Sequence, residues 1–159
     1  MRITLLELAF VVAAVLVAAT ALPRCGGGKP SARAVLASWS RTPGALNPDV
    51  TQATIGSTIC RAGWTRTVRP PVSYTNALKA RQLSQYGLRG PPSAYQEDHL
   101  ISLELGGDPV DPRNLWPEPY PRAAAVDRIE NDLNRRVCAG SLSLAAAQAT
   151  ESALKHRDG

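Results

Sequence analysis

Apolar residues recur at helical spacing between positions 123 and 137. They lie three or four positions apart and are Val126, Ile129, Leu133 and Val137. This spacing places them on one face of an α-helix. Carboxylate and amide residues recur on a neighbouring stripe, and they are Asp127, Glu130, Asn131 and Asn134. The pattern predicts an amphipathic helix over residues 123–137 with acidic side chains beside its apolar face.

Two short apolar runs precede this helix. The first covers residues 99–105, and the second is Asn114-Leu115-Trp116, which Pro117 ends. The segment between them, Gly106-Gly107-Asp108-Pro109, has the composition of a turn. We therefore expect a hairpin with a long loop, followed by the helix.

The flanking segments predict smaller elements. Residues 53–72 have the composition of short extended pieces, stopped by Pro70-Pro71. Thr75 can cap a helix over residues 76–86. An alanine-rich run over residues 144–155 predicts a last helix, whose role is packing.

The first 22 residues differ in composition from the rest of the chain. An apolar run is followed by small residues at Ala19-Thr20-Ala21, as in a secretory signal peptide. The alternative is an uncleaved anchor formed by residues 3–22, against which Glu7 argues because a carboxylate in hydrocarbon is costly. A membrane would be contacted only through that uncleaved segment. Either way we expect a secreted or extracytoplasmic domain (periplasm or cell envelope) over residues 51–159, after a flexible linker over residues 23–50.

The chain has three cysteines. Thiols oxidise outside the cytoplasm, so Cys60 and Cys138 are a natural disulfide pair. Their bond would close a loop of roughly 78 residues. The chain-entropy model gives a stabilisation of the folded state by about 4 kcal/mol for such a loop. Two buried free thiols are the alternative, and Cys25 is the odd cysteine left over.

Charge is distributed unevenly along the chain, whose formal net charge is +5. The segment from Val50 to Gln96 has six basic residues and no acidic one, whereas from Glu97 onward acidic residues outnumber basic ones by eleven to seven. A basic half beside a half with an acidic cluster suits a polyanion beside a cation site. Ordinary surface charge for solubility is the other interpretation.

The residues that could carry chemistry gather in the hairpin and the helix. Their order along the chain is Asp98-His99, Gly106-Gly107, Asn114-Leu115 and Asp127. This order resembles the HNH branch of the His-Me finger (ββα-metal) nucleases over residues 95–137. A wider pattern is similar to a group of small exported bacterial proteins of mostly uncharacterised function, and it adds Cys60, Gly63-Trp64, Trp116-Pro117 and Cys138.

The resemblance implies an α+β fold, with a small ββα-metal core, flanking helices, short strands and one disulfide. It implies that His99 is the general base that deprotonates water, a task that suits an imidazole because its pKa lies near neutrality. Asn114 would brace the hairpin. Asp98 would bind Mg²⁺ or another divalent cation such as Mn²⁺, for which a carboxylate is a hard oxygen donor. The family's last ligand is a His or Asn on the helix; this chain departs from that pattern, and Asp127 is the nearest candidate, with Glu130 as the backup.

Several of these residues also have a structural interpretation when taken alone. Asp127 suits a solvated helix position, and Asn114 suits a turn. Trp64 and Trp116 are more typical of a core than of a platform on which bases stack.

Two hypotheses for the function remain. The first is an exported, metal-dependent HNH-type endonuclease that hydrolyses phosphodiester bonds of nucleic acid, DNA rather than RNA. Basic residues ahead of the hairpin would contact phosphates, largely independent of base sequence, and they are Arg61, Arg66, Arg69, Lys79 and Arg81. The second is a non-catalytic exported module that retains the fold and binds a partner such as an anionic polymer. The non-standard third ligand favours this second hypothesis.

Overall fold

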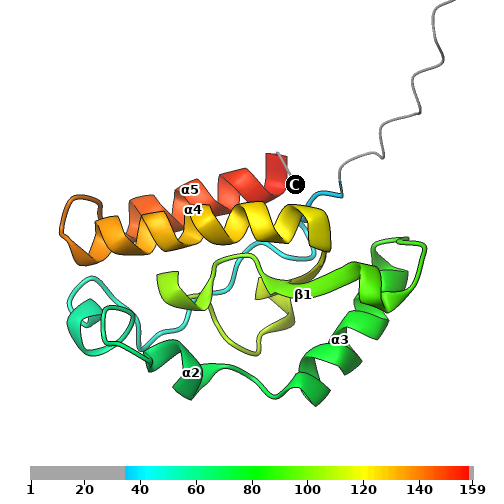
Figure 1. Cartoon of the computed structure of the whole chain (residues 1–159), viewed down its shortest axis with the longest axis horizontal. Helices are drawn as coiled ribbons and strands as arrows, with labels where there is room; N and C mark the ends of the chain where they lie inside the picture. The colour runs from blue at the N-terminus through cyan, green and yellow to red at the C-terminus, as the bar shows by residue number, and fades with distance from the viewer. Residues whose placement is uncertain (1–34, 158–159) are drawn as a thin grey trace, which may run out of the picture. The chain divides into compact units, whose positions relative to one another are not determined.

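The computed structural model describes residues 35–157. The predicted signal peptide or anchor, the first part of the predicted linker and Cys25 lie outside the described residues. In the described part of the chain, no helix has both the length and the apolar character needed to cross a bilayer. The elements are η1 (Ile55–Ser57), α2 (Trp64–Val68), α3 (Val72–Gln85), η2 (Pro92–Ala94), β1 (Tyr95–His99), η3 (Leu103–Leu105), η4 (Pro112–Asn114), β2 (Leu115–Pro119), α4 (Tyr120–Cys138) and α5 (Leu144–Arg157) (Figure 1). The predicted α+β class is confirmed.

The hairpin forms, but its first strand lies earlier than predicted. β1 and β2 pair antiparallel, with His99 opposite Leu115. The apolar run expected to be a strand over residues 99–105 instead leaves β1 at His99 and ends in the 3₁₀ turn η3. Side chains accept the hydrogen bonds of backbone N–H groups in this run: the Ile101 N–H donates to Asn114, and the Ser102 N–H donates to Glu151. The run is therefore buried without the alternation of buried and exposed side chains that is typical of a strand.

β2 continues through two prolines. Pro117 was expected to end the second strand, yet β2 reaches Pro119. Each strand of a two-stranded sheet has one edge without a partner, and a proline, which lacks an N–H, is tolerated there.

The turn after η3 requires glycine at both positions. Gly106 has a φ of 79°, and a Cβ there would lie 2.5 Å from the Val50 side chain. A Cβ on Gly107 would lie 1.8 Å from the Ile101 carbonyl oxygen. The Gly-Gly pair therefore allows the loop to cross directly over the core.

Two helical segments differ from the sequence prediction. Residues 64–68 form the short helix α2 rather than an extended piece, after Gly63 in a left-handed conformation with a φ of 81°. α3 begins at Val72 rather than after Thr75, because Pro71 has the φ of −65° that suits the residue before a helix start.

α4 and α5 pack against each other and cover the hairpin (Figure 1). Val126, Leu133 and Val137 of the predicted stripe are at most 3% exposed, whereas Ile129 is 39% exposed at its edge. Leu144 of α5 joins Leu133 and Val137 in one core cluster.

Residues 35–50 also belong to the folded unit. The Ala37 N–H donates to the Lys155 carbonyl, Leu46 bridges to Gly107, and Val50 is part of the core. This packing differs from the flexible linker expected for residues 23–50, because apolar side chains of this stretch find partners on the helices and the hairpin loop.

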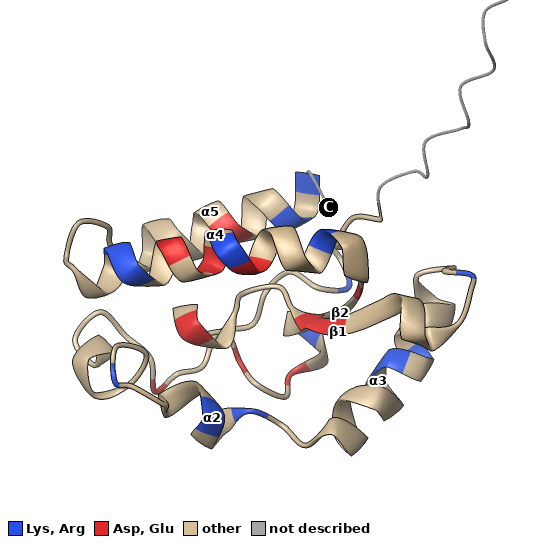
Figure 2. Ribbon diagram, viewed as in Figure 1, with Lys and Arg blue, Asp and Glu red and all other residues tan. Residues whose placement is uncertain are grey.

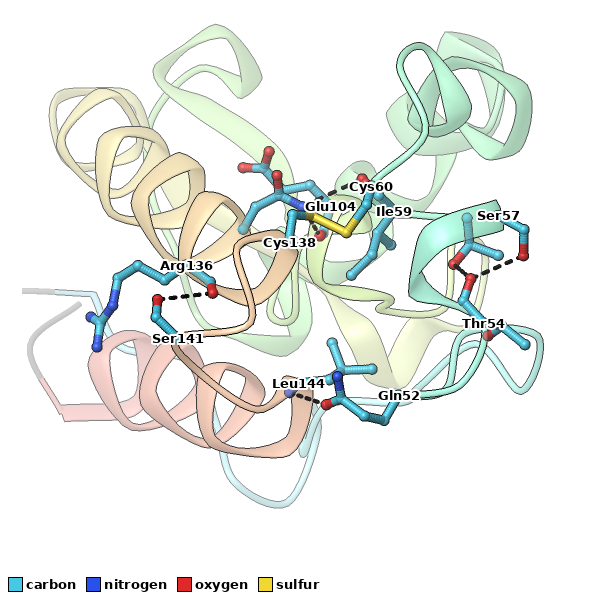
Figure 3. Close-up of a disulfide and its surroundings, with 12 residues drawn as sticks. Gln52, Thr54, Ser57, Ile59, Cys60, Glu104, Arg136, Cys138, Ser141 and Leu144 are labelled. Atoms are coloured by element: carbon cyan, nitrogen blue, oxygen red, sulfur yellow. Dashed lines mark hydrogen bonds between the residues drawn. A yellow bond between two sulfur atoms is a disulfide. The ribbon is translucent and has the colours of Figure 1, made fainter.

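The predicted disulfide between Cys60 and Cys138 is confirmed (Figure 3). Their Cα atoms are 5.5 Å apart, and the bond joins the segment before α2 to the last residue of α4. Close by, the Leu144 N–H at the start of α5 donates to Gln52 (Figure 3). The N-terminal part of the domain is thus attached to both C-terminal helices.

Candidate functional site

Asn114 fastens the loop between the two strands. Its side chain is fully buried, and Oδ1 accepts from the Ile101 N–H at 2.9 Å. Nδ2 donates to the carbonyls of Ile101 and Asp108 at 3.0 and 2.9 Å. The residues just after β1 are therefore held to the residue just before β2.

His99 ends β1 and is 6% exposed. Its Nε2 lies 3.1 Å from the Pro109 carbonyl oxygen. A carbonyl can only accept, so Nε2 carries the proton and Nδ1 holds the lone pair. Nδ1 has no hydrogen-bond partner among residues 35–157. Burial lowers the pKa of His99 from 6.5 despite the opposing effects of the Pro109 carbonyl and Asp98. The ring is therefore a neutral base at pH 7.

Asp98 leaves β1 on the face opposite to His99, as adjacent strand residues do. Its Oδ2 lies 2.8 Å from Nζ of Lys155 on α5, and its Oδ1 accepts from Gln96. Burial alone would raise the pKa of Asp98, but the charge and hydrogen bond of Lys155 outweigh burial and hold that pKa at about 2. Asp98 is therefore an ionised partner of Lys155.

Lys155 is the cation of a closed cluster. Its side chain is 0% exposed, and its Nζ lies 2.6 Å from Glu130 Oε1 and 3.4 Å from Glu151 Oε1. It also donates to the His99 carbonyl. Burial would lower the pKa of Lys155, but the facing carboxylates raise it well above its ordinary value. One ammonium thus connects β1, α4 and α5.

Glu118 and Glu151 are the most deeply buried carboxyl groups near this ammonium. Glu118 of β2 is fully buried, and its one hydrogen-bond partner in the part of the chain that the structure describes is Asp98. Burial and then the charge of Asp98 raise the pKa of Glu118 to about 8. Glu151 accepts from the Ser102 N–H at 3.0 Å, and burial raises its pKa well above 4.5. The cluster holds several acid groups around one lysine, and the raised pKa values of Glu118 and Glu151 favour their protonated, uncharged forms.

A polar cavity of about 400 Å³ opens between α2, η3 and α4. Asp127 and Glu130 line it together, with Gln96 of β1 and Arg69 after α2. Glu104 also lines it; burial and then the charges of Glu130 and Asp127 raise the pKa of Glu104 to about 7. The structure thus brings the two helix carboxylates to one cavity, but neither Asp98 nor His99 lines it.

The five basic residues predicted to contact phosphate occupy different places. Figure 2 shows basic positions on α2 and α3, with acidic residues on β1 and on α4. Arg69 lines the cavity, and its charge acts on both His99 and Glu104. Arg61 lines a second hollow beside the disulfide, which shares Thr65 and Glu104 with the first. Arg66 and Arg81 are exposed, whereas Lys79 donates to the Tyr95 carbonyl.

The predicted metal ligands can be tested against this geometry. Asp98 and Glu130 are carboxylates of the kind that Mg²⁺ prefers, yet both already contact the Lys155 ammonium. Asp127 is exposed on the cavity wall, apart from that cluster. Within residues 35–157, no three acidic, His or Cys side chains have the arrangement of a metal site. The donor set centred on Asp98 therefore does not fit a divalent cation in this structure.

Sequence reasoning missed Lys155, Glu151 and Glu118. A signal was present on α5, because Glu151 and Lys155 continue the buried positions Leu144 and Ala147 at spacings of three and four. A charged pair on the core face of a helix indicates a buried ionic network rather than a solvated one.

Comparisons of this chain with protein-family models, with curated proteins and with solved structures found no match.

Proposed function

We propose that this chain is a nucleic-acid phosphodiesterase of the His-Me finger type, with β1, β2 and α4 as its ββα core. The observation that carries the proposal is the state of His99. It is a neutral imidazole whose Nε2–H is held by the Pro109 carbonyl and whose Nδ1 is left as a base. It ends the first strand of a hairpin whose loop Asn114 fastens.

The chemistry begins with His99 as general base. A water molecule gives a proton to Nδ1, and its oxygen attacks phosphorus. The bond from phosphorus to the leaving oxygen breaks, and that oxygen takes a proton from solvent. The Pro109 carbonyl keeps the ring in one orientation and stabilises the imidazolium that forms. Because Lys155 already holds Asp98, no step is routed through a metal ion.

Arg69 supports binding of the phosphate. Its guanidinium lines the polar cavity and its charge acts on His99, so we assign the phosphate contact nearest this base to Arg69. Guanidinium groups bind phosphate oxygens in a bidentate manner and offset the charge that develops on them. Exposed Arg61, Arg66 and Arg81 would add backbone contacts that do not depend on base sequence. DNA is therefore the first substrate to test, and RNA the second.

Replacing His99 with alanine is expected to lower the rate of plasmid relaxation by about 10² to 10⁴-fold, the usual contribution of a general base. The assay follows conversion of supercoiled DNA to nicked circles by the full chain. Mg²⁺ is present, so that a need for a cation away from Asp98 does not limit the rate.

A basic residue outside the site supplies the matched control. Arg136→Ala removes one exposed charge of α4 and should change the rate by only about twofold. Circular dichroism confirms that both variants are folded. Wild-type activity in folded His99→Ala, or no cleavage of DNA or RNA by the wild type, would exclude the proposal.

One observation favours a second candidate function, the exported module that binds a polyanion without cleaving it. Lys155 neutralises the carboxylate that the resemblance assigns to a metal ligand, and His99 is only 6% exposed. Salt-dependent binding of DNA by a wild type that leaves the DNA intact would support this candidate instead.

A further inference from the structure

The Lys155 ammonium lies between strand β1 and helix α4 and connects them. Its Nζ contacts Asp98 on β1 and Glu130 on α4, at 2.8 and 2.6 Å. Glu151 and the His99 carbonyl complete a shell made only of oxygen atoms. Such a shell around one position is the environment of a hard cation.

We propose that the Lys155 ammonium is the resident cation of this protein, that it excludes divalent metal ions from Asp98, and that the oxygen shell becomes a divalent-cation site when the ammonium is removed. The proposal concerns the cation and holds whether or not the chain cleaves nucleic acid.

The burial of the group supports this assignment. Lys155 is 0% exposed, so it cannot contact a substrate and acts on the site only through Asp98, Glu130 and the end of β1. A lysine that is desolvated this completely stays charged only if carboxylates surround it, and they do. A metal ion at Asp98 would have to displace this ammonium from its ion pairs.

The excess of acid supports the second half of the proposal. Asp98, Glu130 and Glu151 face a single ammonium, and the buried carboxyl of Glu118 lies beside Asp98, where burial and the charge of Asp98 raise its pKa to about 8. Among the described residues, Asp98 is the one hydrogen-bond partner of the Glu118 carboxyl. Without Lys155, these oxygens would be hard ligands whose buried charges have no counter-charge, which favours binding of a divalent cation.

Binding of Mn²⁺, followed by calorimetry on the full chain, tests the proposal. Asp98→Asn should bind Mn²⁺ no more weakly than the wild type, because Asp98 is not a metal ligand in the wild type. Lys155→Met should bind Mn²⁺ at least about tenfold more tightly than the wild type, and adding Asp98→Asn to it should abolish that gain. Lys79→Met is the matched control, since it removes a lysine that bonds a backbone carbonyl, and it should show no gain.

Each other outcome contradicts the proposal. Wild-type binding that Asp98→Asn abolishes would make Asp98 a metal ligand beside Lys155. A folded Lys155→Met that gains no affinity would show that the oxygen shell is not a latent cation site. If Lys155→Met alone is unfolded by circular dichroism, Mn²⁺ should restore its helical signal, and a failure to restore it overturns the proposal as well.

Discussion

Replacing Lys155 with methionine is expected to lower the free energy of unfolding by about 3 to 5 kcal/mol at pH 8, the usual cost of removing one partner of a buried ionic network. Methionine keeps most of the volume but removes the charge, and Asp98, Glu130 and Glu151 then face one another without a cation. Urea denaturation, followed by circular dichroism in metal-free buffer, measures the change.

The loss of stability caused by Lys155→Met should be smaller at pH 5 than at pH 8. Without the ammonium, mutual repulsion and burial raise the carboxyl pKa values of the folded variant above those of its unfolded chain. The folded variant then binds more protons than the unfolded chain, so its stability decreases as the pH rises through this range. Arg135→Met, which breaks an exposed ion pair with Asp132, should cost only about 0 to 1 kcal/mol. Equal stability of the two variants would contradict a central role for Lys155.

Removing the disulfide should destabilise the domain by a similar amount. The bond between Cys60 and Cys138 closes a loop with a sequence separation of 78 residues. For such a loop the chain-entropy model gives about 4 kcal/mol, because the cross-link restricts the unfolded chain. The double variant Cys60→Ser, Cys138→Ser should therefore unfold at a markedly lower urea concentration, with Trp64, which packs against the core beside Cys60, as a fluorescence probe.

Reduction provides the matched control for the disulfide. Dithiothreitol should lower the urea midpoint of the wild type to that of the double variant, and it should leave the midpoint of the double variant unchanged. A wild type whose midpoint resists full reduction would show that the helices and the core, rather than the cross-link, hold the N-terminal part in place.

Local chemistry made several features predictable from the sequence. The stripe of α4 follows from the spacing of Val126, Leu133 and Val137, which are the residues it buries. The Gly106-Gly107 turn follows from composition, and the structure gives the reason, since neither position has room for a Cβ. The cysteine pair was predictable because the expected export of the chain implies oxidation of its thiols.

The position of β1 was not predictable from local pattern. Tyr95–His99 contains four polar residues, so its composition does not favour a strand over a loop. The strand forms because β2 pairs with it, and because Lys79 and Lys155, far apart in sequence, each donate to one of its carbonyls. Such long-range contacts leave no periodic signal within the strand itself.

The centre of the site was missed for the same reason. The resemblance covers residues 95–137, whereas the cation that pairs with Asp98 is Lys155, on a helix beyond that range. Asp127 matched the expected spacing along α4, but it lies exposed on the cavity wall. Spacing indicates which helix face a residue occupies; it does not indicate which charge a distant helix brings to that face.

The central claim is that His99 acts as a neutral base, and the pH dependence of the cleavage rate tests it most directly. Because burial lowers the pKa of His99 below 6.5, the wild-type rate should be constant around neutral pH. It should decrease only at pH values below 6.5, where the imidazole becomes protonated. His99→Ala should lose both the activity and this acidic decrease. A His99→Ala variant that cleaves at the wild-type rate with the same pH profile would contradict the account.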